Sequence, residues 1–186
     1  ALGETNLTCI ASGAFLPAWP ATDARLAFSS DRDGNLEIYV MNADGTGQTN
    51  LTSNGAADYR PAWSPDATRL AFSSDRDGNS EIYVMNADGT GQTNLTSNGA
   101  DDYRPAWSPD GTRLAFESDR DGNDEIYVMN ADGSDLNRLT NNAFEDREPA
   151  WSPDGTRLAF NSQRDGAYEL YVMNANGSNP VRLTNN

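Results

Sequence analysis

The chain of 186 residues contains neither lysine nor histidine and has a single cysteine, Cys9. Without histidine it lacks the commonest general base and metal ligand, and without lysine it lacks the usual residue of phosphate loops and Schiff bases. One cysteine cannot form a disulfide within the chain. No apolar run approaches the roughly 18 to 20 residues that cross a bilayer. These absences exclude most familiar catalytic arrangements and a membrane-spanning helix.

Acidic residues dominate the charge, because 28 Asp and Glu oppose 13 arginines and leave a formal net charge of −15. Such a surface repels phosphate backbones, so we expect no nucleic-acid partner and favour cationic ligands or metal ions instead. With 37% hydrophobic residues the chain is able to bury a core. We therefore expect one folded domain over residues 1–186.

The most informative feature that is present is an internal repeat of 44 residues. Tryptophan recurs at this spacing, at Trp19, Trp63, Trp107 and Trp151. We place the repeats at residues 14–52, 58–96, 102–140 and 146–184, with 1–10 as an additional outer-strand segment. Self-similarity at such a period indicates a repeat architecture. A side chain that recurs in every copy is therefore expected to belong to the scaffold, and we expect the tryptophans to wedge between repeats.

Each repeat contains four short runs of aromatic, β-branched and other apolar residues, bounded by Gly, Pro, Asn and Asp. In the third repeat these runs predict strands at 104–107, 113–118, 125–130 and 136–140. Ser-Pro-Asp-Gly and Arg-Asp-Gly-Asn predict tight hairpin turns between the first three. No segment keeps helical spacing for long. The sequence therefore predicts an all-β fold, a β-propeller of four-stranded antiparallel blades with about four blades per chain.

The repeat also resembles a known family. The string PAWSPDGTRLAF, followed by SDRDGN, EIYVMNADG and a closing LT, is similar to the TolB-type β-propeller repeat of bacterial envelope proteins and of prolyl-oligopeptidase propellers. The resemblance covers practically the whole chain and implies a propeller fold. It implies little about function, because such blades are the scaffold of many different proteins.

The strand-four segment occurs five times, once more than the other three, because residues 5–8 and 181–184 both match it. Three arrangements stay open from the sequence. The chain could close as a four-blade monomer with a spare terminal strand. Two chains could form an eight-blade ring, or chains could join head to tail by strand exchange. The chain could also be a fragment of a longer protein.

Antiparallel order places the turn between strands two and three on the same face as the link between repeats. Near the start of strand one, at the expected channel entrance, the copies diverge, and loops on a rigid scaffold commonly hold function. Drift on a solvated loop is the alternative explanation. The candidate ligand-binding residues are Asp58, Tyr59, Arg60, Asp102, Tyr103, Arg104, Asp146, Arg147 and Glu148.

The turns between strands two and three offer oxygen atoms at alternating positions around a glycine, as part of a calcium loop does, so Ca²⁺ is a candidate and no other cofactor is expected. The candidate metal ligands are Asp31, Asp33, Asn35, Glu37, Asp75, Asp77, Asn79, Glu81, Asp119, Asp121, Asn123 and Glu125. Asp-Gly-Asn is also what a hairpin requires. The alternative is therefore a structural turn whose arginine pairs with neighbouring carboxylates.

From these features we expect no catalytic residues and a non-enzymatic scaffold that binds a protein, peptide or other ligand through an acidic loop face or a central channel. One alternative is a structural protein whose chains assemble into rings or extracellular filaments. Another is a carboxylate-based hydrolase, with Glu145, Asp146 and Glu148 as the source of an acid/base pair, or the propeller of a larger hydrolase. The resemblance implies a periplasmic or extracellular location.

Overall fold

The computed structural model describes residues 14–20 and 25–185, which form strands and turns, with no helix long and apolar enough to cross a membrane in that part of the chain. The strands are β1 Ala14–Ala18, β2 Arg25–Ser30, β3 Glu37–Asn42, β4 Thr49–Asn50, β5 Asp58–Trp63, β6 Arg69–Ser74, β7 Glu81–Asn86, β8 Thr93–Asn94, β9 Asp102–Trp107, β10 Arg113–Ser118, β11 Glu125–Asn130, β12 Asn137–Arg138, β13 Asp146–Trp151, β14 Arg157–Ser162, β15 Glu169–Asn174 and β16 Val181–Arg182.

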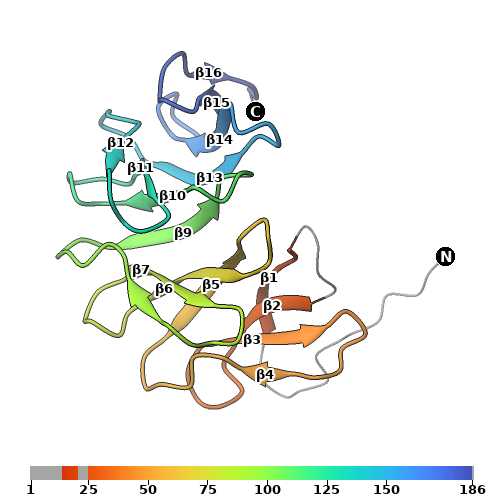
Figure 1. Ribbon diagram of the computed structural model, residues 1–186. Helices are drawn as coiled ribbons and strands as arrows, with labels where there is room; N and C mark the ends of the chain where they lie inside the picture. The colour runs from red at the N-terminus through yellow and green to blue at the C-terminus, as the bar shows by residue number, and fades with distance from the viewer. Residues whose placement is uncertain (1–13, 21–24, 186) are drawn as a thin grey trace.

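The strands form four sheets, each with its four strands side by side in chain order and antiparallel. We call these sheets blade one (β1–β4), blade two (β5–β8), blade three (β9–β12) and blade four (β13–β16). The all-β prediction and its four-stranded blades are confirmed. In Figure 1 the blades follow one another in an arc, and the first strands of successive blades, β1, β5, β9 and β13, contact each other.

The arc does not close on itself. Within the described ranges, no strand of blade four contacts a strand of blade one. The described residues thus do not form a closed four-blade ring. The predicted outer-strand segment at residues 1–10 lies outside the described residues.

The predicted boundaries are right for strands two and three of blade three and wrong for strands one and four. Strand β9 begins at Asp102, two residues early, because Asp102 and Tyr103 already pair with Ser118 and Glu117 of β10. Strand β12 covers only Asn137–Arg138. Its ladder ends because the Ile126 N–H donates to the Thr140 hydroxyl at 2.8 Å, so a side chain replaces the backbone acceptor.

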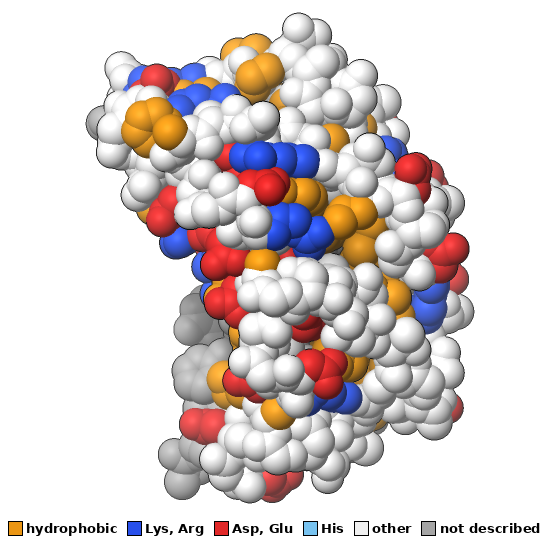
Figure 2. Space-filling model, turned by 90° about the vertical axis from the view of Figure 1, so that its left-hand side faces the viewer, with side chains coloured by type: hydrophobic (Ala, Val, Ile, Leu, Met, Phe, Trp, Pro, Cys, Tyr) orange, Lys and Arg blue, Asp and Glu red, His pale blue; other side chains and the backbone are white. Residues whose placement is uncertain are grey.

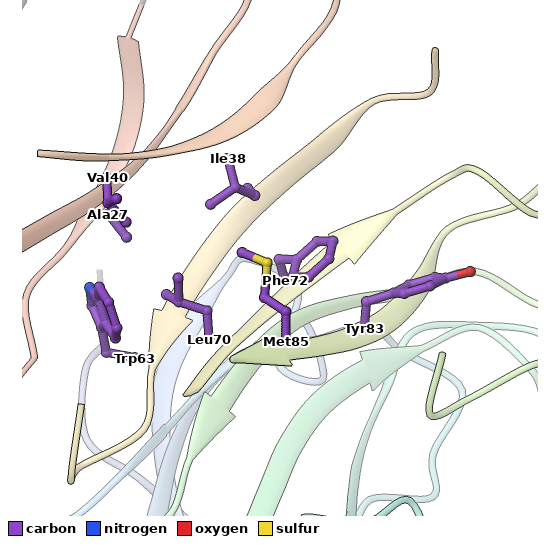
Figure 3. Close-up of a cluster of buried hydrophobic side chains, with 8 residues drawn as sticks. All are labelled: Ala27, Ile38, Val40, Trp63, Leu70, Phe72, Tyr83 and Met85. Carbon is purple, nitrogen blue, oxygen red and sulfur yellow. The ribbon is translucent and has the colours of Figure 1, made fainter. Parts of the chain in front are cut away.

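Each contact between blades joins a row of smaller side chains to a row of large ones. Across the first contact, the small row of blade one faces the aromatic row of blade two, as Figure 3 shows. The small row is Ala27, Ile38 and Val40, and the aromatic row is Trp63, Leu70, Phe72, Tyr83 and Met85. The same two rows meet between blades two and three and between blades three and four. Full burial of such a side chain contributes about 1.5–3 kcal/mol, so these contacts hold the arc together.

The tryptophan prediction is confirmed inside the arc. Trp63 and Trp107 are 7% and 8% exposed and pack against the preceding blade. An arginine of that preceding blade lies over each ring, with Arg69 4.7 Å from the ring centre of Trp107. Trp19 differs, because it is 56% exposed.

A buried ion pair fixes the start of the inner strand in three blades. Asp58, Asp102 and Asp146 are fully buried, and each accepts hydrogen bonds from the arginine of the turn between strands two and three of its own blade. The Arg120–Asp102 separation is 2.9 Å. On the side of the molecule shown in Figure 2, arginine and acidic side chains lie beside one another rather than in separate fields.

We expect Asp102→Ala to lower the free energy of unfolding by about 3 kcal/mol, because the change leaves the mostly buried Arg120 without its carboxylate. Urea unfolding measures this loss. A variant as stable as the parent would show that the ion pair does not hold the strand.

Blade one lacks this pair, because its residue equivalent to Asp58 is an alanine. Ala14 pairs with Ser30 in β2, just as Asp58 pairs with Ser74 in β6. The Nη2 atom of Arg32 is buried and has no hydrogen-bond partner among the described residues. We expect Ala14→Asp to supply the missing acceptor and to stabilise the protein by about 1.5 kcal/mol in the same urea assay. A lower unfolding midpoint would contradict this account.

Candidate functional site

The inner strands line the concave side of the arc, and each contributes one proline to it. Pro17, Pro61, Pro105 and Pro149 surround a cavity of about 280 Å³, together with Arg60, Arg104 and Glu148. Proline donates no backbone hydrogen bond, and it is tolerated here because these strands are the first of their sheets. The surface is therefore lined by apolar rings with a few charged side chains between them.

The residue before each of three prolines has a left-handed backbone. Arg60, Arg104 and Glu148 have φ of 57°, 54° and 59°, and the pairing register shifts at this point of each inner strand. A non-glycine residue in this conformation costs about 1–3 kcal/mol and persists only where the surroundings enforce it. Here the preceding blade helps to enforce it, because the N–H of Arg60 donates to the Ser29 hydroxyl at 3.1 Å. The bulge places these three residues beside the cavity.

A second cavity, of about 250 Å³, adjoins the first and shares Arg60 and Arg104 with it. We call it the channel mouth. Its lining is Tyr59, Arg60, Tyr103, Arg104, Glu117, Asp124 and Arg147. Tyrosine and arginine are enriched in protein interfaces, where each combines apolar area with hydrogen-bonding groups.

Two of the three arginines at the channel mouth are matched by carboxylates. Arg104 lies 2.6 Å from Glu117, and Arg147 lies 2.6 Å from Asp124. Glu117 is 1% exposed, and it also accepts the N–H of Glu148. Burial raises the pKa of Glu117 above its ordinary value, although its bonds from Arg104 oppose this.

Arg60 is the unmatched arginine. Its guanidinium has no carboxylate within ion-pair distance in the described part of the chain. Burial, followed by the neighbouring charge of Arg104, lowers the pKa of Arg60. In addition, the buried Nε of Arg104 has no acceptor among the described residues. The channel mouth thus presents hydrogen-bond donors without a partner among the described residues, while its arginines do not outnumber the nearby carboxylates, since Glu148 lies 3.5 Å from Arg104 and Glu145 3.2 Å from Arg147.

The predicted ligand-binding residues separate into two groups. Tyr59, Arg60, Tyr103, Arg104 and Arg147 line the channel mouth, and Glu148 lines the adjoining cavity. Asp58, Asp102 and Asp146 are instead fully buried in the ion pairs that hold the inner strands. These three aspartates precede the lining residues in sequence, and the strand buries their side chains.

The prediction did not name Glu117 and Asp124, which line the channel mouth. It also did not name Asn161 and Tyr168, which line a third cavity of about 240 Å³ together with Arg104, Arg147 and Glu148. A signal for them was present in the repeat. The position of Glu117 is Ser, Ser, Glu and Asn along the four copies, and that of Asp124 is Leu, Ser, Asp and Tyr. Both positions vary inside segments that otherwise repeat, Glu117 within β10 and Asp124 directly before β11, so divergence within or beside a strand identifies lining residues as well as divergence in links does.

Many oxygen atoms of the candidate calcium turns accept hydrogen bonds within the protein, although Asp31 Oδ1 and Glu125 Oε2 are buried without a partner among the described residues. Asp77 accepts from the Tyr83 hydroxyl and from Asn94, and Glu81 accepts from Thr96 and from the Asn98 N–H. The structure gathers no three acidic side chains that could hold a metal ion in residues 14–20 and 25–185. In the second and third of these turns the arginine pairs with a carboxylate, as the alternative interpretation expects, whereas Arg32 of the first turn has no such pair among the described residues. Calcium binding stays a prediction.

The acidic trio near the last inner strand also has partners of its own. Glu145 accepts from Tyr168 and lies 3.2 Å from Arg147, while Asp146 is bound to Arg164. Glu148 accepts from Asn161 at 2.7 Å. Each carboxylate is therefore occupied by a different donor, and the acid/base pair stays a hypothesis.

Four antiparallel four-stranded sheets around a concave inner surface define a β-propeller domain. Comparison with known proteins identifies the family. The model of the TolB beta propeller domain matches residues 5–105 and 102–186, so the chain belongs to this family. A search of curated protein sequences found no match.

Solved structures give the same fold. A putative TolB from Agrobacterium tumefaciens has 29% identity and a TM-score of 0.80, over 86% of this chain and 60% of its own. TolB from Acinetobacter baumannii has 25% identity and a TM-score of 0.84, over 96% and 45%. A chain of a nidogen/laminin complex, at 14% identity and a TM-score of 0.78 over 94% and 66%, shares the fold alone. The chain thus spans about half of the TolB proteins that it resembles.

We expect Glu117→Ser to cost more stability near pH 4 than near pH 7. Burial raises the pKa of Glu117 in the folded protein. Its contribution to the free energy of unfolding is therefore fully present below the pKa of an unfolded glutamate, about 4.3, and is lost as the pH rises through the folded pKa. Serine restores the residue found at Ser29 and Ser73 and keeps an acceptor for the Glu148 N–H. Urea unfolding of both proteins at the two pH values tests this. An equal loss at both would contradict it.

Proposed function

We propose that this chain is a non-catalytic propeller module that binds a polypeptide through the channel mouth, and that the bound segment presents a carboxylate to Arg60. The observation on which this rests is the half-buried guanidinium of Arg60, which forms no ion pair with a carboxylate of the described residues. A charged hydrogen bond to an ionised acceptor is roughly twice as strong as a neutral one. An anionic group is therefore the ligand chemistry that this position favours.

The overall charge of −15 points instead to cationic ligands. The local arrangement outweighs it, because exposed charges more than about 10 Å away are screened at ordinary salt concentrations. Within the channel mouth, Glu117 and Asp124 are already held by Arg104 and Arg147. Arg60 is the arginine of the channel mouth that forms no ion pair with a carboxylate of the described residues.

A polypeptide fits better than a small ion, because the two adjoining cavities have volumes of about 280 and 250 Å³ and share their arginines. Their lining combines proline and tyrosine rings with charged groups, which suits a segment having both apolar and acidic side chains. Support for a non-catalytic role comes from membership of the TolB propeller family and from the absence of histidine and lysine in the sequence. The same membership supports a periplasmic or extracellular location.

Titration with labelled peptides tests the proposal. We expect a Glu-rich peptide to bind more tightly than an equally long Gln-rich or Lys-rich peptide, and added salt to weaken its binding. Arg60→Gln should reduce the affinity for the acidic peptide about tenfold, because one charged hydrogen-bonding group is lost.

The matched control is Arg157→Gln, which removes an exposed arginine on β14 away from the channel mouth. It should leave the affinity unchanged. Equal losses of affinity in the two variants would mean that the peptide responds to the net charge of the protein rather than to Arg60. Preference for the Lys-rich peptide would overturn the proposed ligand chemistry.

A further inference from the structure

A further cavity, of about 380 Å³, lies between blades three and four. Arg113, at the start of β10, and Asn130, at the end of β11, line its blade-three side, and Asn176, in the turn between β15 and β16, lines its blade-four side. The cavity shares no lining residue with the channel mouth. Its volume lies in the range of roughly 300–1,000 Å³ that is usual for small-molecule sites. We call it the rim cavity.

A hydrogen bond that bridges blades one and two has no counterpart at the rim cavity. Between blades one and two, the Gln92 Nε2 atom donates to the Leu51 carbonyl at 3.0 Å. The corresponding residues of blades four and three are Pro180 and Leu139, and a proline side chain has no donor. Leu139 lines the rim cavity. The cavity therefore adjoins the place that a glutamine side chain crosses in the first contact.

A bridging hydrogen bond of the second contact is also missing here. Between blades two and three, Arg69 Nη1 donates to the Ala131 carbonyl at 3.4 Å. Arg113 is the counterpart of Arg69, and its guanidinium lies 4.6 Å from the ring centre of Trp151. Within the described part of the chain this guanidinium donates no hydrogen bond and forms no ion pair. Its N–H groups are free to bind a ligand in the rim cavity.

The rim cavity also presents hydrogen-bond acceptors. The carboxylate of Asp135 is exposed and has neither a donor nor an arginine partner among the described residues. Asn137 donates through Nδ2 to the Asp135 carbonyl at 2.7 Å, and Asn130 donates within its own turn, so the Oδ1 atoms of both amides stay open. Asn176 is the reverse case, because its Oδ1 accepts two bonds within its turn and its Nδ2 stays open. Donors and acceptors are thus mixed around one cavity.

Asp135 occupies a backbone position that favours glycine. Its φ is 56°, and the corresponding residues of blades one and two are Gly47 and Gly91. A non-glycine residue in this conformation is strained, and such strain concentrates at ligand sites. Blade three thus adds a carboxylate at a strained position and directs it to the lining of the rim cavity.

We propose that the rim cavity binds a neutral mono- or disaccharide. A sugar hydroxyl both donates and accepts hydrogen bonds, so neighbouring hydroxyls satisfy Arg113 and Asn176 as acceptors and Asp135 and Asn137 as donors. Leu139 adds an apolar contact for the C–H groups of a sugar ring. A site built from such polar groups also selects against ligands that lack the hydroxyls.

A free amino acid is the competing ligand. Its carboxylate would pair with Arg113 and its ammonium group with Asp135, the two charged groups of the rim cavity that have no ion pair within the described residues. It would leave the open amide atoms without partners, and unsatisfied polar groups reduce affinity. The three amides of the lining therefore favour the sugar.

Saturation-transfer NMR on the full chain tests the site, with glucose, galactose, N-acetylglucosamine, cellobiose and lactose as probes. We expect at least one sugar to receive saturation from the protein, and its titration to give the affinity. Asp135→Gly restores the residue of Gly91 and removes an acceptor. Pro180→Gln restores the residue of Gln92, whose amide would cross to the Leu139 carbonyl and obstruct the cavity. Each change should weaken binding about tenfold, since a hydrogen-bonding group or its space is lost.

The matched control is Thr93→Ala, because Thr93 is exposed and is the blade-two counterpart of Asn137. Thr93→Ala and Arg60→Gln should both bind the sugar as the parent does. Absence of saturation for every sugar would overturn the proposal, and so would equal affinities in the parent, Asp135→Gly and Pro180→Gln. Loss of sugar binding in Arg60→Gln would move the sugar to the channel mouth. Tighter binding of free alanine than of any sugar would contradict the proposed ligand class.

Discussion

The contact between a small row and an aromatic row is the interaction on which the rest of this structure depends. A single four-stranded sheet has two apolar faces and cannot hide either alone. By placing Ala, Ile and Val on one face and Trp, Leu, Phe, Tyr and Met on the other, each blade fits onto an identical neighbour. The stacking of the described blades is thus a consequence of one packing rule.

The buried ion pairs position the site without belonging to it. Asp102 holds the turn arginine Arg120 and fixes the start of β9, so that the following Tyr103 and Arg104 lie along the concave surface. A left-handed residue before the proline then shifts the strand register. Repeated residues therefore build the frame. The side chains that face the cavities are drawn mainly from positions where the copies differ.

At the channel mouth the acidic side chains are paired with arginines, and Arg60 is the arginine that forms no ion pair within the described residues. Most acidic side chains are spread over the surface or are bound to arginines and hydroxyls, and they set the net charge of −15. Glu117 and Asp124 are bound to Arg104 and Arg147, and Arg60 is the arginine that the proposed ligand would contact. The composition of the whole chain is for this reason a poor guide to the ligand of one cavity.

The repeat by itself determined the all-β class, the four-stranded blades, the limits of strands two and three, and the wedging of Trp63 and Trp107. These follow from alternation, turn residues and spacing, which are local properties of the chain. Only the tertiary structure decided that Asp58, Asp102 and Asp146 are buried partners of arginine, that Glu117 and Asp124 join the site, and that the described blades form an open arc. Burial and pairing between residues far apart in sequence depend on how successive blades rotate against each other, and no local pattern encodes that rotation.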